Sequence, residues 1–312
     1  MSKYPRIHSY AYVLGDSRSL DTLRGPIDPA RIADLQADGM DRYCESEKSE
    51  ADLGICSLLR SLETAELRGS DLDLIIFCSA GLGQAGVDRN EFNVRCADHE
   101  LATVPIVGMT AVGCSAAAPA LRIAASLIQT DQARHIAVVT ADRETLAQNR
   151  LTQLGAAILS DGAASFIVSR HANSGQLVLG SAQTADQRLR AMHRDAQVPR
   201  LLARSARKMR DVVLNALSAS GVGTGDVGRI VMTNLKRSAN HFVVLQAGLT
   251  TDILYEGSLA RIAHVFSADP IINLLEATVE ETGGAPARSS QEFTLLLSLS
   301  PYSWGAVILA NP

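Results

Sequence analysis

The stretch TVPIVGMTAVGCSAAAPALRIAASLI (Thr103–Ile128) joins an apolar run to an alanine-rich run through a turn of small residues that contains Cys114. The run Val104–Met109 is typical of a buried strand, and the alanine-rich run predicts a helix that starts just after the cysteine. A thiol in the first turn of a helix feels the positive end of the helix dipole and several unpaired backbone N–H groups. Because this environment favours the thiolate, the sequence predicts a nucleophile at Cys114. The alternative is a small cysteine that fills a tight packing site between strand and helix.

The composition excludes several classes of protein. A chain of 312 residues, 46% hydrophobic and 20% charged, can bury a large core, and its net charge of -4 argues against broad nucleic-acid binding. No run approaches the roughly 18 apolar residues needed to span a bilayer, and the N-terminus is not typical of a signal peptide. Five cysteines without a regular spacing are typical of free thiols, so we expect a cytoplasmic protein with no metal site.

Strand-like and helix-like runs alternate along the chain, which predicts an α/β layered fold. The order of the runs repeats, with the turn at Cys114 in the first half and a turn at His264 in the second. We therefore expect two α/β halves, residues 1–172 and 173–312, whose helices after Cys114 and His264 begin at a shared centre. The expected strands are 72–79, 104–109, 135–140, 163–169, 176–180, 229–232, 293–300 and 306–309, and the expected helices are about 49–67, 121–128, 199–220, 239–247 and 267–281.

The segment GLGQAG (Gly81–Gly86) matches the G-x-G-x-x-G pattern of dinucleotide-binding proteins. The rest of that pattern is missing, because the next predicted strand ends in Thr110 rather than in the acidic residue that would bind a ribose. The segment that follows Gly86 is also polar for a helix buried against a sheet. We therefore expect a flexible glycine loop here and not a nucleotide site.

Four segments resemble the ketoacyl-ACP synthase III group of the thiolase-like condensing enzymes. They are VGCSAAAPALRIAASLI (112–128), AVVTAD (137–142), LSDGAASFI (159–167) and YSWGA (302–306), and they stand in the order that the family has. The resemblance runs from about residue 50 to the end of the chain. It implies the thiolase-like five-layered αβαβα fold of two duplicated halves, usually assembled as a homodimer.

The family's triad of cysteine, histidine and asparagine resembles Cys114 together with two partners that have exchanged places. Asn234, in the turn after the predicted strand 229–232, is nearest to the family's histidine position, with Thr233 as the alternative. The family's asparagine position holds His264 instead, where we expect a neutral imidazole that can act as a base. The family's glycine-rich loop is replaced by a segment without glycine, so the resemblance implies an oxyanion hole formed by the N–H groups of Cys114 and Ser300.

The resemblance also implies an acyl thioester as substrate and no cofactor beyond its phosphopantetheine arm. The tryptophan and arginine that related enzymes use to bind CoA have no clear match in residues 31–45, which favours an acyl carrier protein over CoA as the donor. A cluster of basic side chains is a candidate docking site for an acidic carrier protein or its phosphate, although a solvated basic face is the alternative. The cluster consists of Arg207, Lys208, Lys236 and Arg237.

These resemblances imply a ketosynthase III-like acyltransferase, which we expect to act in specialised metabolism. Cys114 is expected to take an acyl group from an acyl carrier protein or CoA thioester. The group then passes to a malonyl-type carbon nucleophile in a Claisen condensation, or to an oxygen or nitrogen nucleophile. Two alternatives stay open: a non-catalytic partner subunit of a heteromeric condensing enzyme, and a cysteine hydrolase that uses water as the acceptor.

Overall fold

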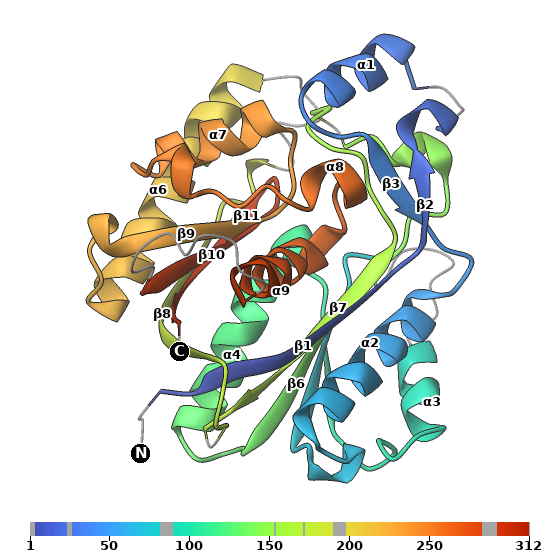
Figure 1. Ribbon diagram of the computed structural model, residues 1–312, viewed down its shortest axis with the longest axis vertical. Coiled ribbons are helices and arrows are strands. Elements are labelled where there is room, and N and C mark those ends of the chain that lie inside the picture. Colours follow the sequence, from blue (N-terminus) through green and yellow to red (C-terminus); the bar gives the residue numbers. More distant parts are fainter. Residues whose placement is uncertain are drawn as a thin grey trace.

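The computed structural model describes residues 4–23, 27–81, 90–152, 154–170, 172–189, 198–282 and 292–311. A nine-stranded sheet runs through the molecule (Figure 1). Its strands lie in the order β5 (Ile106–Met109), β4 (Leu74–Cys78), β6 (His135–Asp142), β7 (Gly162–Ser169), β1 (Arg6–Leu14), β8 (Gln176–Ala185), β11 (Ser303–Ala310), β10 (Phe293–Leu299) and β9 (Val227–Met232). β4 is parallel to both β5 and β6, and β9 is parallel to β10, whereas the other neighbouring pairs are antiparallel.

Two helices, α4 (Ala117–Gln129) and α9 (Asp269–Thr282), lie at the centre of the molecule (Figure 1). Their buried side chains form one core with side chains from β4, β6 and β7 on one side and from β9, β10 and β11 on the other. The outer faces of these strands pack against α2 (Glu50–Ala65) and α3 (Glu91–Ala97) in the first half. In the second half they pack against α6 (Val198–Ser220) and α7 (Arg237–Gln246). The layers are therefore α2 with α3, the strands of the first half, α4 with α9, the strands of the second half, and α6 with α7. This order confirms the predicted αβαβα fold.

The strands β4, β6, β7, β10 and β11 are buried along almost their whole length because both of their faces are covered. Successive residues of a strand point to opposite faces. Thus Ile75 packs in the outer core of the first half, whereas Ile76 packs in the central core. In the second half, Leu295 packs in the outer core and Leu296 packs in the central core. A sheet buried on both faces produces such continuous hydrophobic runs, which is why the sequence identified these strands.

Every predicted strand and helix is present, with ends that differ by a few residues. The N-terminal region contains elements that the sequence did not predict. They are β1, β2 (Asp16–Ser19), β3 (Arg42–Glu45) and α1 (Pro29–Ala37). Within the polar segment after Gly86, Glu91–Ala97 forms the short helix α3, which buries Phe92 and Cys96, whereas residues 87–89 lie outside the described residues. Residues 82–86 of the glycine-rich segment lie outside the described residues, and the boundary between residues 172 and 173 stays a prediction.

The imidazole of His8 in β1 makes the structure sensitive to acid. Its Nδ1 lies 2.9 Å from Ser9 Oγ, and its Nε2 lies 2.5 Å from Ser169 Oγ in the neighbouring strand β7. Burial, together with the charge of His135, lowers the pKa of His8 from 6.5 to about 4. Between these two pH values the unfolded chain binds more protons at His8 than the folded protein does. The contribution of His8 to stability is therefore complete above pH 6.5 and is lost as the pH falls towards 4.

We expect the urea midpoint of unfolding to fall between pH 7 and pH 4.5, and to fall less in His8→Gln. The glutamine side chain has no proton to gain in this range, so the difference between the two proteins isolates the histidine from the carboxylates. Parallel curves for the wild type and the variant would contradict the assignment of this pH dependence to His8.

Candidate active site

Cys114 lies in a single 3₁₀ turn, Gly113–Ser115, between β5 and the first residue of α4. Gly113 has a φ of +57°, and a Cβ there would lie only 2.9 Å from the hydroxyl of Tyr302, so the turn requires glycine. Two hydroxyl oxygens accept the first N–H groups of α4: Ser267 Oγ accepts Ala116 N–H, and Ser298 Oγ accepts Ala118 N–H. Side chains from the second half of the chain thus hold the turn that carries the cysteine.

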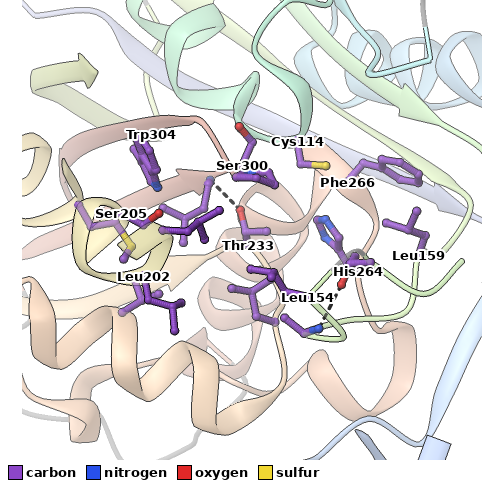
Figure 2. Close-up of a pocket in the computed structure, with 18 of the residues that line it drawn as sticks. Cys114, Leu154, Leu159, Leu202, Ser205, Thr233, His264, Phe266, Ser300 and Trp304 are labelled. Carbon is purple, nitrogen blue, oxygen red and sulfur yellow. Dashed lines mark hydrogen bonds between the residues drawn. The ribbon is translucent and has the colours of Figure 1, made fainter. Parts of the chain in front are cut away.

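His264 lies between the short helix α8 (Leu259–Ile262) and the start of α9. The residues beside it have unusual backbone conformations, since Ala263 and Phe266 have φ values of +48° and +49°. Positive φ values at non-glycine residues cost free energy and are concentrated at functional sites. The ring of Phe266 stacks on the imidazole with centroids 5.8 Å apart. Figure 2 shows His264 and Cys114 turned towards one another at one end of a pocket.

A buried carboxylate, Asp269, completes the arrangement behind the histidine. His264 Nδ1 lies 2.5 Å from Asp269 Oδ2, and the exposed fractions of the two side chains are 4% and 0%. The same carboxylate accepts the backbone N–H groups of Asn234, at 2.8 Å, and Val265, at 2.6 Å. These bonds fix the carboxylate and orient the imidazole, whose other ring nitrogen is left to face the thiol of Cys114.

The electrostatics of this site favour a protonated histidine. Burial alone would lower the pKa of His264, but the charges of Asp269 and Cys114, with hydrogen bonds to both, raise it to about 10. These charges favour an imidazolium at His264 rather than the neutral imidazole expected from the sequence, because that expectation did not include Asp269.

Of the two residues considered for the first partner, Thr233 lines the pocket and Asn234 does not. The Asn234 side chain is buried, and its amide donates to Ala263 O at 2.8 Å and to Ser258 Oγ at 3.2 Å. Its Oδ1 accepts a hydrogen bond from Asn273 at 2.9 Å. The Asn234 amide thus holds the segment that carries His264, and both of its N–H groups are used within the protein.

The expected second oxyanion donor is engaged elsewhere. Ser300 lines the pocket, but its N–H donates to Ser303 O at 2.9 Å. Ser303 N–H in turn donates to Ser300 Oγ at 3.1 Å. These two hydrogen bonds close the hairpin between β10 and β11, which contains Pro301. The Ser300 N–H that was expected to bind an oxyanion is therefore used in this turn. For Cys114 N–H, the other predicted donor, no acceptor is found among the described residues.

The pocket that opens from Cys114 and His264 has a volume of about 340 Å³ and mostly apolar walls. Its sides come from α6, from the segment 149–159 and from the β10–β11 hairpin (Figure 2). The residues that line it besides Cys114, Thr233, His264, Phe266 and Ser300 are Asn149, Leu151, Thr152, Leu154, Ala156, Leu159, Leu201, Leu202, Ser205, Met209, Leu235, Val243, Leu299, Pro301 and Trp304. Leu154 and Leu202 are 41% and 40% exposed, which marks them as the rim. The pocket therefore extends from this rim to Cys114.

The four basic residues predicted to dock a carrier differ in their surroundings. Lys236 Nζ lies 2.7 Å from Asp34 of α1, and Arg237 Nε lies 3.2 Å from Glu256, so both charges are partly neutralised within the chain. Arg207 is exposed on α6 and Lys208 is half-buried there. The same helix contributes Leu202, Ser205 and Met209 to the pocket.

In the part of the chain that the structure describes, no three His, Cys, Asp or Glu side chains are grouped so that they could hold a metal ion. A search of the same residues for a helix long and apolar enough to cross a membrane found none.

The region around Cys114 matches a known protein family. The family model for 3-oxoacyl-[acyl-carrier-protein (ACP)] synthase III matches residues 109–187, which include Cys114 and Asp161. No curated protein matches the sequence at a significant level.

Solved structures resemble the whole chain. The 3-oxoacyl-[acyl-carrier-protein] synthase III from Aquifex aeolicus has 19% identity and a TM-score of 0.81, with 98% of this chain and 99% of that chain covered. ChlB3, described as an acyltransferase, has 18% identity and a TM-score of 0.83 over 99% and 98% of the two chains. The priming β-ketosynthase from the R1128 polyketide biosynthetic pathway has 16% identity and a TM-score of 0.78 over 99% and 96%.

The predicted resemblance to the ketoacyl-ACP synthase III enzymes is thereby confirmed, and the chain has their thiolase-like fold. Together with the family match, the fold supports a condensing or acyl-transferring enzyme. At these identities the structural likeness establishes the fold alone, so the reaction has to be argued from the residues of the site.

Proposed function

We propose that the protein is an acyltransferase that forms a thioester on Cys114 and passes the acyl group to an oxygen or nitrogen nucleophile. The observation that carries this proposal is the chain of contacts from Cys114 through His264 to Asp269 at the end of an apolar pocket. A nucleophile, a base and a group that orients the base form the general arrangement for covalent acyl transfer.

The charges of the free site suit the first step, acylation of Cys114. The Cys114 thiolate attacks the carbonyl carbon of a donor thioester, and the donor's C–S bond breaks. The His264 imidazolium gives its proton to the leaving thiolate, which departs as a thiol. The acyl group is now bonded to Cys114, and His264 is neutral. The raised pKa of His264 in the free protein is therefore compatible with a later role as a base, because acylation removes both its proton and the neighbouring negative charge.

The second step distinguishes a heteroatom acceptor from a carbon acceptor. Neutral His264 can take the proton from an alcohol or amine as that nucleophile attacks the acyl carbon, after which the C–S bond breaks and the Cys114 thiolate re-forms. A decarboxylating malonyl-type nucleophile instead requires a pair of donors that stabilise an enolate. The amide of Asn234 is turned away from the pocket, and Asp269 increases the basicity of His264, so the site favours the first kind of acceptor.

The donor in this proposal is an acyl carrier protein that docks at the rim of the pocket along α6. Arg207 is exposed there, on the helix whose residues Leu202, Ser205 and Met209 line the pocket. We expect Arg207→Glu to raise the KM for an acyl carrier protein and to leave the KM for the matching acyl-pantetheine unchanged. Equal effects on both donors would contradict carrier docking at this helix. All five cysteines are free thiols, which supports the proposal of a reducing, cytoplasmic setting.

A homodimer formed through β5 is part of the same proposal. In the described residues β5 pairs on one side with β4 and has no strand on its other edge, and Val107 in this strand is 50% exposed. An open edge with apolar side chains is a template for pairing with another strand. Light scattering on the purified protein is expected to give the mass of a dimer, and Val107→Lys is expected to shift it towards the monomer. A monomeric wild-type protein would contradict the proposal.

Intact-protein mass spectrometry with a panel of acyl-CoA and acyl-carrier-protein thioesters tests the proposed activity, with Cys114→Ala as the control. A mass increase that is absent in the control would establish the acyl-enzyme. The acylated protein is then offered an alcohol, an amine and a malonyl-carrier protein. Transfer to the alcohol or amine supports the proposal, whereas release of CO₂ from the malonyl group would overturn it in favour of condensation. Loss of the adduct to water alone would indicate a hydrolase, and no adduct with any donor would indicate a non-catalytic partner subunit.

A further inference from the structure

Thr233 lines the pocket but has no role in the acyl transfer described so far. It follows the last residue of β9 and lines the pocket together with Cys114 and His264. Its side chain is 1% exposed, and Figure 2 shows it between Ser300 and His264. A buried hydroxyl beside a nucleophile and a base is a candidate for a direct role in the reaction.

The hydrogen bonds of Thr233 determine which role its hydroxyl can have. Thr233 Oγ1 accepts the backbone N–H of Leu299 at 3.0 Å, and Thr233 N–H donates to Leu297 O at 3.2 Å. Thr233 follows β9 and Leu299 ends β10, and these two buried strands pair in parallel. The Oγ1 atom of Thr233 is therefore fixed in position. With a lone pair already used by Leu299, the hydroxyl is polarised to donate its proton, and a donated bond gains strength when the oxygen also accepts one.

The site needs such a donor, because Ser300 N–H, one of the two expected donors, is engaged, and so are the neighbouring polar groups. Ser300 N–H donates to Ser303 O, Leu299 N–H donates to Thr233 itself, and the amide of Asn234 donates to Ala263 O and Ser258 Oγ. Both steps of acyl transfer pass through a tetrahedral intermediate whose oxygen carries a negative charge. A hydrogen-bond donor aimed at that oxygen is worth a large part of the rate.

We propose that the hydroxyl of Thr233 and the N–H of Cys114 together form the oxyanion hole of this site. The inference rests on the proposed acyl transfer and assigns to Thr233 the position that Ser300 was expected to hold. When a nucleophile adds to the acyl carbon, the C=O electron pair moves onto the carbonyl oxygen, which accepts hydrogen bonds from Thr233 Oγ1–H and Cys114 N–H. No proton is transferred from Thr233. When the intermediate collapses, the C=O bond re-forms and the C–S bond breaks.

The experiment compares Thr233→Val, which keeps the shape and removes the hydroxyl, with Thr233→Ser, which keeps the hydroxyl. The rate of Cys114 acylation is measured by quenched single-turnover mass spectrometry with the best donor of the wild-type protein. Thr233→Val is expected to acylate about 10²–10³-fold more slowly, as is typical for the loss of one oxyanion donor, and Thr233→Ser is expected to stay within about tenfold of the wild type.

Alkylation of Cys114 by iodoacetamide separates this role from a structural one. Displacement of iodide forms no oxyanion, so its rate is expected to be the same in Thr233→Val and in the wild type. If acylation and alkylation fall together, Thr233 holds the thiol or the histidine in place and the proposal is overturned. If the wild type is acylated and Thr233→Val is acylated equally fast, the proposal is also overturned. If the wild type itself forms no acyl-enzyme, it is the proposed function that fails, and unchanged alkylation would show that the thiol is intact.

Discussion

Asp269→Asn is expected to lower the rate of acyl transfer about 10³–10⁴-fold, the size of loss known when the carboxylate behind a catalytic histidine becomes an amide. The carboxylate accepts the proton of His264 Nδ1 at 2.5 Å and thereby leaves the other ring nitrogen to face Cys114. An amide nitrogen at this place would donate instead, so the imidazole would turn or take the wrong tautomer. Asp269→Asn also removes a negative charge that raises the pKa of His264 against the effect of burial. The pKa of His264 is therefore expected to be lower in the variant.

Single-turnover transfer from acyl-Cys114 to the preferred acceptor measures this loss, with circular dichroism as the check that the variant is folded. Glu276→Gln is the matched control, since it removes a carboxylate from the same helix α9. Glu276 bonds to Tyr12 at 2.9 Å and to Arg261 and does not line the pocket, so we expect its rate to be unchanged. Transfer by Asp269→Asn within tenfold of the wild type would contradict the role given to Asp269.

The fold could be predicted because its central strands are recognisable in the sequence. β6 and β7 are buried on both faces over nearly their whole length, and a strand of this kind is a continuous apolar run. β1 has a mixed pattern, with the partly buried polar residues His8 and Ser9 among its apolar ones, which is why a strand is not recognisable there from the sequence. The helix α3 escaped prediction for a related reason, because it has few buried residues and an otherwise polar sequence.

The site was predicted in part, and the errors have physical causes. Thr233 and Asn234 are neighbours at the end of a strand, where adjacent side chains point in opposite directions, so a shift of one residue decides which of them faces the pocket. Asp269 was missed because an acidic residue in the first turn of a helix is common for reasons of helix stability alone. A carboxylate five residues after His264 was the available signal, but only the turn at Phe266 brings it back to the imidazole.

A buried ion pair holds the segment that forms one wall of the pocket. Arg150 and Asp161 have side chains that are 2% and 0% exposed, and both Nη atoms of the arginine lie 3.0 Å from the carboxylate. The carboxylate also accepts the N–H groups of Ser46, at 2.8 Å, and Glu144, at 2.9 Å. Arg150 donates in addition to Leu159 O at 2.9 Å. The pair therefore closes the loop from 150 to 161, whose residues line the pocket, against the end of β3.

Arg150→Met is expected to lower the free energy of unfolding by about 3–5 kcal/mol, because it leaves the charge of Asp161 buried without its partner. Asp161→Asn in the same chain removes that charge, so the double variant is expected to recover part of the loss in urea unfolding. Arg68→Met is the control: Arg68 pairs with Asp71 at 3.2 Å on the surface, where its side chain is 75% exposed, and its loss is expected to leave the urea midpoint nearly unchanged. If Arg150→Met costs as little as Arg68→Met, or if the double variant is less stable than the single one, the pair does not stabilise this wall in the way described.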